Sequence, residues 1–104
     1  MRELPECPIA RTAVIIGTRW TAQILREMMD HGPRRFQDLT EALPGIAPNT
    51  LSARLKMLEA SNVVEREFYA DHPPRAAYKL TARGEKMRTI LNAMRLWGSE
   101  HPAN

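Results

Sequence analysis

The chain has 104 residues, of which 43% are hydrophobic and 26% are charged, ordinary values for one globular domain. Its 15 Lys and Arg against 12 Asp and Glu give a formal charge of +3, which permits a nucleic-acid partner without requiring one. No apolar run could cross a bilayer and no signal-peptide pattern opens the chain, so we expect a cytoplasmic protein. The single cysteine excludes an internal disulfide.

Two helices are expected in the N-terminal third of the chain. Residues 8–16 carry apolar side chains at helical spacing, and Gly17 is expected to end this helix in a left-handed conformation. A second helix is expected over about 19–31, with Thr18 as its candidate N-cap.

Residues 36–60 are predicted to form a short helix, a tight turn and a longer helix. The turn at 43–46 (LPGI) contains a proline and a glycine, which both break helical geometry. Leu51, Leu55 and Leu58 recur at helical spacing and are expected to pack inward, as are Phe36, Leu39 and Leu43 of the short helix. This order describes a helix-turn-helix, whose second helix commonly enters the DNA major groove.

A β-hairpin is expected to follow the second helix. Residues 63–69 (VVEREFY) are rich in β-branched and aromatic side chains, 70–75 hold two prolines, and 76–80 (AAYKL) alternate as a returning strand should. Thr81 is then the candidate N-cap of one long final helix. Its apolar stripe consists of Met87, Ile90, Leu91, Met94 and Trp97.

The predicted fold is therefore mostly α with a small β-hairpin wing, in one domain over residues 7–101. It is a winged helix-turn-helix with extra N- and C-terminal dimerisation helices. The stripe of the final helix and the apolar first helix offer more nonpolar surface than so small a core needs, so we infer a homodimer through them. A two-fold dimer would place its reading helices about 34 Å apart on an inverted repeat.

Candidate DNA contacts lie on the second helix of the motif, in the wing and before the first helix. Arg54 could donate two hydrogen bonds to guanine, or instead contact a phosphate or pair with Glu59, and Asn49 could pair with adenine. The cationic wing tip could contact phosphate or the minor groove, or be an ordinary turn. The full candidate set is Arg34, Arg35, Pro48, Asn49, Thr50, Ser52, Arg54, Lys56, His72 and Arg75.

Some of these candidates have a structural alternative. Arg34 and Arg35 could pair with the carboxylates of Asp38 or Glu41 instead of touching the DNA backbone. Lys56 could contact a phosphate or simply be solvated.

Several short motifs occur in a recognisable order. They are CPI at 7–9, GTRW at 17–20, ILRE at 24–27, RRF at 34–36, LPGI at 43–46, LSARL at 51–55, PR at 74–75, YKLT at 78–81 and Gly84. In this order the chain resembles the HxlR family of bacterial winged-helix transcriptional regulators, relatives of the MarR type. The resemblance implies a homodimer built from the terminal helices, a recognition helix and a wing. Ala47 stands where a serine that would cap the recognition helix is more common, and Asn62 replaces a more usual glycine.

The resemblance also bears on Cys7, because some members of the family sense oxidants or electrophiles through a thiol near this position. Such a role needs an exposed, thiolate-prone cysteine. The alternative is a small apolar residue packed at the dimer seam.

A ligand pocket between the terminal helices and the DNA-binding unit is a further expectation. Trp20, Met28 and Trp97 are its candidate lining, although such residues more often belong to the core.

No enzyme signature is visible: the histidines are scattered, and the chain has neither a thiolate zinc site nor a phosphate-binding glycine loop. We therefore expect no catalysis, no cofactor and no metal. The sequence predicts a DNA-binding transcriptional regulator with double-stranded DNA as partner and a small-molecule or electrophile effector. The alternative is a winged-helix protein-interaction module that does not bind DNA.

Overall fold

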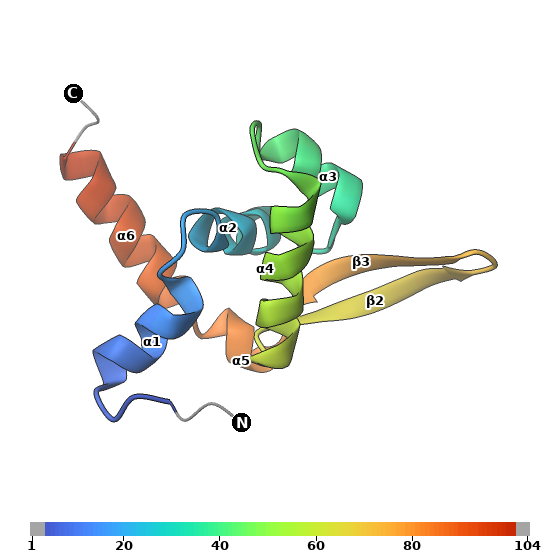
Figure 1. Cartoon of the computed structure of the whole chain (residues 1–104). Helices are drawn as coiled ribbons and strands as arrows, with labels where there is room; N and C mark the ends of the chain where they lie inside the picture. The colour runs from blue at the N-terminus through green and yellow to red at the C-terminus, as the bar shows by residue number, and fades with distance from the viewer. Residues whose placement is uncertain (1–3, 102–104) are drawn as a thin grey trace.

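The computed structural model describes residues 4–101, in which helices surround a core and a long hairpin projects from one side (Figure 1). The helices are α1 (Pro8–Ile16), α2 (Thr21–His31), α3 (Phe36–Ala42), α4 (Pro48–Ala60), α5 (Ala82–Glu85) and α6 (Arg88–Glu100). The strands are β1 (Arg34–Arg35), β2 (Val64–Asp71) and β3 (Pro74–Leu80). The predicted winged helix-turn-helix is confirmed, with α3 and α4 as the motif and β2–β3 as the wing.

The wing belongs to a three-stranded antiparallel sheet with the order β1-β3-β2. Its third strand, β1, pairs with β3 so that Arg34 lies opposite Tyr78 and Arg35 opposite Ala77. The sequence did not predict β1, because a two-residue strand carries no alternation of polar and apolar side chains. This short strand ties the base of the wing to the chain just before α3.

The core lies where α2, α3 and α4 meet, and the expected leucine stripe of α4 is confirmed. Leu51, Leu55 and Leu58 are at most 2% exposed, and Leu39 of α3 is fully buried beside them. The expectation for Phe36 is wrong, since this side chain is 36% exposed. Phe36 is the first residue of α3 and lies about one turn before Leu39, the residue of this helix that is buried in the core.

The turn between α1 and α2 differs from the prediction. Gly17 has φ −80° and its N–H donates to the Ala13 oxygen at 2.8 Å, so it ends α1 without a left-handed conformation. Thr18 is not the N-cap of α2, because that helix begins only at Thr21. The Thr18 hydroxyl instead contacts the Thr21 hydroxyl across the intervening turn.

The predicted long final helix is divided into α5 and α6. Thr81 caps α5 as expected, accepting a hydrogen bond from the Gly84 N–H at 3.0 Å, and its own hydroxyl donates to the Asn62 oxygen at 2.7 Å. A Cβ on Gly84 would lie 2.1 Å from the Val63 oxygen, so only glycine allows this close approach. Asn62, at φ 59°, makes the reversal after α4 that brings Val63 there.

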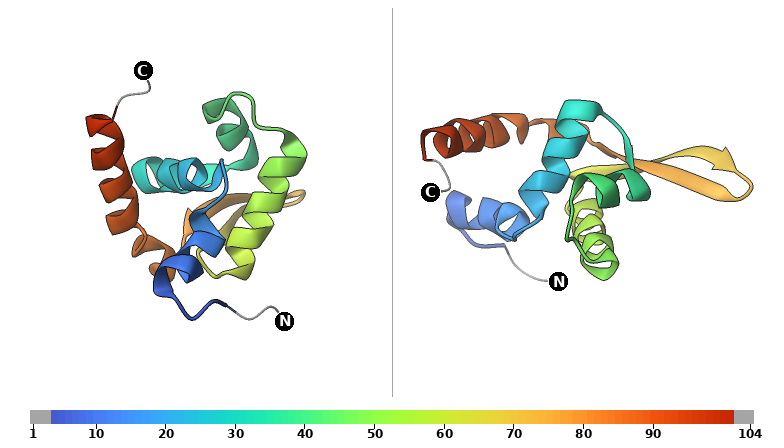
Figure 2. Two further views of the ribbon diagram at one scale, coloured as in Figure 1. Left: turned by 60° about the vertical axis from the view of Figure 1, so that its left-hand side comes forward. Right: turned by 90° about the horizontal axis from the view of Figure 1, so that it is seen from above.

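The terminal helices lie on the side of the molecule away from the wing, as Figure 2 shows from above. α1 has no buried residue among those described, although most of its side chains are apolar. Within residues 4–101 no helix combines the length and the apolar character needed to cross a membrane.

Candidate nucleic-acid interface

The exposed face of α4 begins with the residues predicted to reach DNA. Pro48 and Asn49 are exposed, and Thr50 and Ser52 are half-buried on the first two turns. This face is presented because the leucines of the opposite face are anchored in the core. The N-cap residue is Ala47, which makes no side-chain hydrogen bond, so backbone N–H groups at the start of α4 stay open to an anion.

Two cations follow on α4, and they differ in their surroundings. Lys56 is exposed, whereas Arg54 is half-buried and its Nε is enclosed without a hydrogen-bond partner among the described residues. The expected alternative, a salt bridge from Arg54 to Glu59, is not formed. The Glu59 carboxylate instead lies 2.9 Å from the Arg66 Nε on β2.

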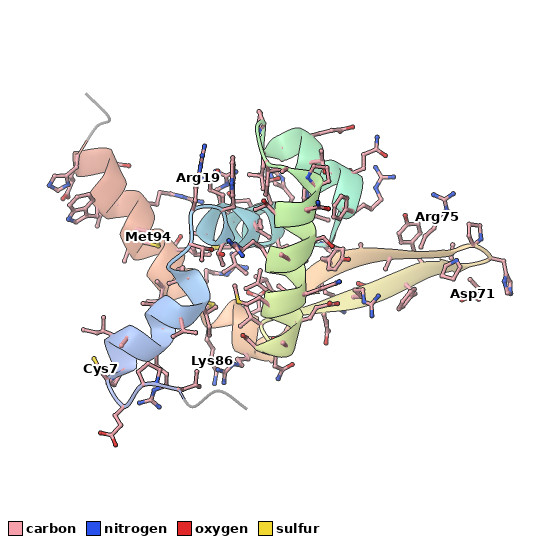
Figure 3. All side chains as sticks on the ribbon, in the orientation of Figure 1. Cys7, Arg19, Asp71, Arg75, Lys86 and Met94 are labelled. Atoms are coloured by element: carbon pink, nitrogen blue, oxygen red, sulfur yellow. The ribbon has the colours of Figure 1, made fainter. Side chains whose placement is uncertain are left out.

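The wing carries its cationic residues at the outer end, well away from the core. His72 and Arg75 are both exposed, and Figure 3 shows Arg75 on β3 near the tip of the hairpin, with Asp71 at the tip. None of the ion pairs formed among residues 4–101 involves Lys56, His72 or Arg75. These three side chains are therefore free to meet phosphates.

The side-chain links that orient the wing were not apparent from the sequence. The Arg66–Glu59 ion pair joins β2 to α4, and Lys79 lies 3.7 Å from Glu65 and 3.5 Å from Glu67 across the hairpin. Two carboxylates therefore offset the charge of Lys79, which leaves this side chain less available to a phosphate than Lys56 or Arg75. The i to i+2 alternation of Glu65 and Glu67 along one strand face was the available signal.

Exposed aromatic side chains on the wing were also missed. Phe68 and Tyr69 are 56% and 54% exposed, and the Arg66 guanidinium lies 5.6 Å from the centre of the Phe68 ring. The sequence pattern predicts a strand for both aromatics but does not predict their exposure. A run of aromatic residues directly before the predicted wing tip was the signal for an exposed position.

The two arginines before α3 have separate partners. The Arg34 guanidinium lies 3.0 Å from the carboxylate of Glu27, which is buried, so its partner is neither Asp38 nor Glu41. Arg35 does pair with Asp38, at 2.8 Å, and the backbone N–H of Arg35 donates to the same carboxylate at 2.9 Å. These hydrogen bonds lower the pKa of Asp38 to about 2 and raise the pKa of Arg35.

The residues predicted to line a ligand pocket do not come together around one. Met28 is 3% exposed in the core, Trp20 packs partly buried against that core, and Trp97 is 63% exposed near the end of α6. The cavity between α2 and α6 is lined by Ala22, Gln23, Arg26, Leu91, Met94 and Arg95 instead. The predicted lining consisted of large apolar residues. In the structure Met28 and Trp20 pack in or against the core, and Trp97 lies exposed on α6.

Cys7 is the N-cap residue of α1 and is exposed. The side chain of Arg11 folds back over this turn and donates to the Glu6 backbone oxygen at 2.8 Å. The thiol is therefore open to solvent, on the side of the molecule where the terminal helices lie.

Comparison with known proteins gives one consistent family. A family model described as HxlR-like helix-turn-helix matches residues 15–104. The chain is 39% identical over 94 residues to the HTH-type transcriptional regulator sll1512 of Synechocystis, a match that covers 90% of this chain and 69% of the relative. It is 35% identical over 95 residues to the HTH-type transcriptional regulator YodB of Bacillus subtilis, covering 90% of this chain and 84% of YodB.

Solved structures agree with the sequence matches. The redox regulator HypR in its oxidized form superposes with a TM-score of 0.86 at 33% identity, covering 94% of this chain and all of that one. Diamide-treated YodB from B. subtilis superposes with a TM-score of 0.74 at 33% identity, covering 94% of this chain and 97% of that one.

Proposed function

This chain belongs to the HxlR-like helix-turn-helix family, and from that premise we propose that it acts as a homodimer on an inverted-repeat DNA operator. Its general role is that of an HTH-type transcriptional regulator, and the family is not one of enzymes. The proposal rests on an exposed polar face at the start of α4 together with a cationic tip at the outer end of the wing. The proposed DNA-binding domain spans residues 7–101.

Each part of this surface has a separate task in the proposed complex. In this proposal Asn49 and Ser52 meet base edges in the major groove, while Lys56 neutralises a phosphate. The open N–H groups at the start of α4 donate hydrogen bonds to the oxygens of a second phosphate, because no side chain of Ala47 occupies them. Arg75 and His72 at the wing tip contact the backbone or the adjacent minor groove.

The apolar surfaces of the terminal helices support the dimer. Ile9 on α1 is 81% exposed, and Leu96 and Trp97 on α6 are each 63% exposed. A groove of about 410 Å³ between these helices is lined by Pro8, Ile9, Thr12, Ala13, Ile16 and Ile90. The interface formed when a second copy covers this surface would resemble that of an obligate homodimer, which is more apolar than ordinary protein surface.

Selection of bound DNA from a random pool tests the proposal. We expect an inverted repeat whose half-sites lie about one helical turn apart, because a two-fold dimer presents two copies of α4. Binding should weaken steeply with salt, and Arg75→Gln should reduce the salt slope by about 1 without changing the sequence preference. Lys79→Gln is the matched control, since carboxylates already offset the charge of Lys79. A weak interaction with no preferred sequence would instead favour a protein-interaction module.

A redox response is the second part of the proposal. Cys7 is exposed, and two structurally similar proteins are a redox regulator and a regulator treated with the oxidant diamide. We expect a maleimide to label Cys7 in the native protein, and diamide to change operator affinity in the wild type but not in Cys7→Ser. A thiol that reacts only in denaturant would mean that Cys7 is a small apolar residue at the dimer seam.

A further inference from the structure

The loop between α1 and α2 carries an arginine that lies outside the DNA contacts predicted from the sequence. Arg19 is exposed, and its guanidinium carbon lies 4.5 Å from the centre of the Trp20 ring. We propose that Arg19 is a further DNA-contact residue, which binds a backbone phosphate on the side of α4 away from the wing. This inference rests on the proposed function, because it adds a phosphate-binding point to the same surface.

Trp20 places Arg19 next to the start of α4. The Trp20 ring packs partly buried against the core, and its Cη2 atom lies 4.0 Å from the position that a Cβ on Gly45 would take. Gly45 belongs to the turn that leads into α4, just before the N-cap residue Ala47. An arginine stacked on this ring therefore lies near the uncapped end of α4, where the open N–H groups already favour a phosphate.

The loop that carries Arg19 is held in place on both sides. The Thr18 hydroxyl contacts the Thr21 hydroxyl, and the Ile24 N–H donates to the Trp20 oxygen at 3.0 Å. The guanidinium is attracted to the ring through its charge, and its N–H donors stay available to a phosphate. A side chain oriented in this way loses less conformational entropy when it binds.

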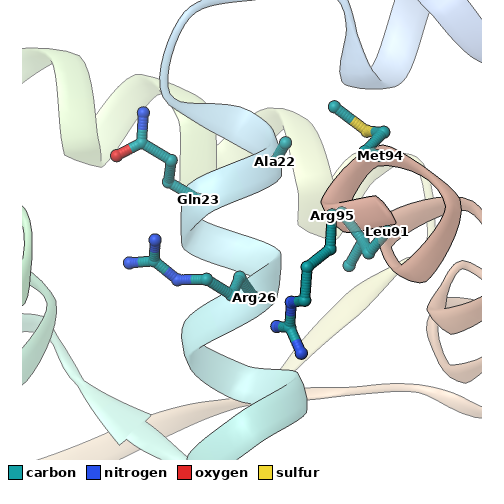
Figure 4. Close-up of a pocket in the computed structure, with 6 residues that line it drawn as sticks. All are labelled: Ala22, Gln23, Arg26, Leu91, Met94 and Arg95. Atoms are coloured by element: carbon teal, nitrogen blue, oxygen red, sulfur yellow. The ribbon is translucent and has the colours of Figure 1, made fainter. Parts of the chain in front are cut away.

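No carboxylate pairs with Arg19 among residues 4–101. The two arginines that Figure 4 shows at the cavity between α2 and α6 differ in this respect. Arg26 meets Glu27 at 3.1 Å. Arg95 meets Asp30 at 3.2 Å. The charge of Arg19 is therefore not offset within the described chain, which favours a phosphate as its partner.

Arg54 adds a second cation on the same flank of α4. It lies five residues before Glu59, which is about 140° around the helix. Because Glu59 pairs with Arg66 on the wing, Arg54 lies on the flank away from the wing. The Nε of Arg54 is enclosed, whereas its two terminal nitrogens are neither enclosed nor hydrogen-bonded within residues 4–101. Arg54 thus supports a phosphate contact on this flank.

The placement of Arg19 predicts which phosphate it binds. Figure 3 shows Arg19 and Arg75 on opposite sides of α4. Arg19 follows α1 closely, and α1 belongs to the proposed dimer surface, so Arg19 lies nearer the two-fold axis than the wing does. Each half-site would then be held at its outer edge by the wing and at its inner edge by Arg19.

The test is ethylation interference with the full chain on the operator selected from the random pool, since ethylation removes the charge of one phosphate at a time. We expect the wild type to lose binding when a phosphate at the inner edge of a half-site is ethylated. Arg19→Gln should remove that interference alone, and Arg75→Gln should remove only the outer one. The salt slope should fall by about as much in Arg19→Gln as in Arg75→Gln. Arg83→Gln, on the exposed face of α5, is the matched control and should change neither.

Inner-edge interference that persists in Arg19→Gln would overturn the inference, as would an equal loss in Arg83→Gln. Absence of sequence-specific binding by the wild type would instead overturn the proposed function, and the inference with it. Arg19 is exposed, so its variant should keep the circular dichroism spectrum of the wild type.

The positioning role of Trp20 has a separate readout. Trp20→Leu removes the ring and should weaken the inner-edge interference, whereas Trp20→Phe keeps an aromatic face for the guanidinium and should restore it in part. A folded Trp20→Leu variant with full inner-edge interference would show that the ring does not position Arg19. Arg19→Gln decides whether Arg19 binds the phosphate even if Trp20→Leu unfolds the chain.

Discussion

Ala47 leaves the proposed reading helix without a side-chain cap. The residue has φ −75° and ψ 143°, the extended geometry that a serine or threonine cap also adopts. No strain therefore opposes a capping residue at this position. The absence of a cap costs stability, but it keeps the first N–H groups of α4 available to a DNA phosphate.

We expect Ala47→Ser to raise the free energy of unfolding by about 1 kcal/mol, because the new hydroxyl accepts a hydrogen bond at the start of α4. For a domain of this size the midpoint of thermal unfolding should rise by about 4–8 °C. Ala53→Ser, on the exposed middle of the same helix, is the matched control and should be slightly destabilising. A similar gain in both variants would contradict a capping effect.

Asp38 carries the clearest pH dependence among the described residues. Its pKa is lowered to about 2 by hydrogen bonds from the Arg35 guanidinium and, next, from the Arg35 backbone N–H. The unfolded carboxyl titrates near pH 4, so the stabilisation is present above about pH 4 and is lost as the pH falls towards about 2.

An NMR titration of side-chain carboxyl carbons should therefore place the midpoint of Asp38 near 2 in the native protein. In Arg35→Gln the midpoint should move up towards that of a free aspartate, and only in part, because the backbone hydrogen bond remains. A native midpoint near 4 would mean that the Arg35–Asp38 pair does not persist in solution.

At the level of the elements, Glu27 joins α2 to the sheet that carries the wing. Its buried carboxylate lies 3.0 Å from the guanidinium of Arg34 on β1, and β1 pairs with β3. A second guanidinium, from Arg26, lies 3.1 Å away on the other side. Removal of one partner of a buried ion pair leaves a poorly compensated charge, which is costly.

We expect Glu27→Gln to lower the free energy of unfolding by about 2 kcal/mol, less than for a fully buried pair because both arginines are partly exposed. Amide hydrogen exchange along β3 should become faster, since β1 is held less firmly. Glu85→Gln removes a carboxylate from an exposed pair with Arg88 and should change stability by less than about 0.5 kcal/mol. Equal effects of the two substitutions would show that Glu27 does not brace the wing.

For the whole molecule, the wing and the apolar terminal helices lie on opposite sides (Figure 1). In the proposed complex, this separation leaves one surface for DNA and the other for a second copy. Neither Ile9 nor Trp97 contributes to the buried core of the chain, as they are 81% and 63% exposed. Disruption of the proposed dimer should therefore leave the winged-helix domain folded.

We expect a chain with Ile9→Glu and Trp97→Glu to sediment as a monomer with an unchanged circular dichroism spectrum, because charges are costly to bury in an apolar interface. Phe68→Glu replaces another exposed apolar side chain, on the wing, and should leave the proposed dimer intact. A double variant that remains dimeric would place the interface elsewhere.

Much of the candidate site could be predicted from the sequence, because it lies on elements with strong local signals. The i, i+4, i+7 leucines of α4 determine which side chains of that helix are exposed, and Asn49 and Lys56 are exposed as the pattern requires. Their contacts with DNA stay predictions. The pairs Arg34–Glu27 and Arg66–Glu59 could not be predicted from the sequence. The two residues of each pair lie on different elements, and only tertiary packing brings them together.

The sequence by itself determined the order of the elements, including α1 at Pro8–Ile16, the turn before α4 and the hairpin, because periodicity, prolines and glycines act over a few residues. Tertiary structure alone decided the strand β1, the close approach of Gly84 in α5 to Val63, and the cavity between α2 and α6. These features depend on contacts between segments far apart in the chain, and no local pattern encodes such contacts.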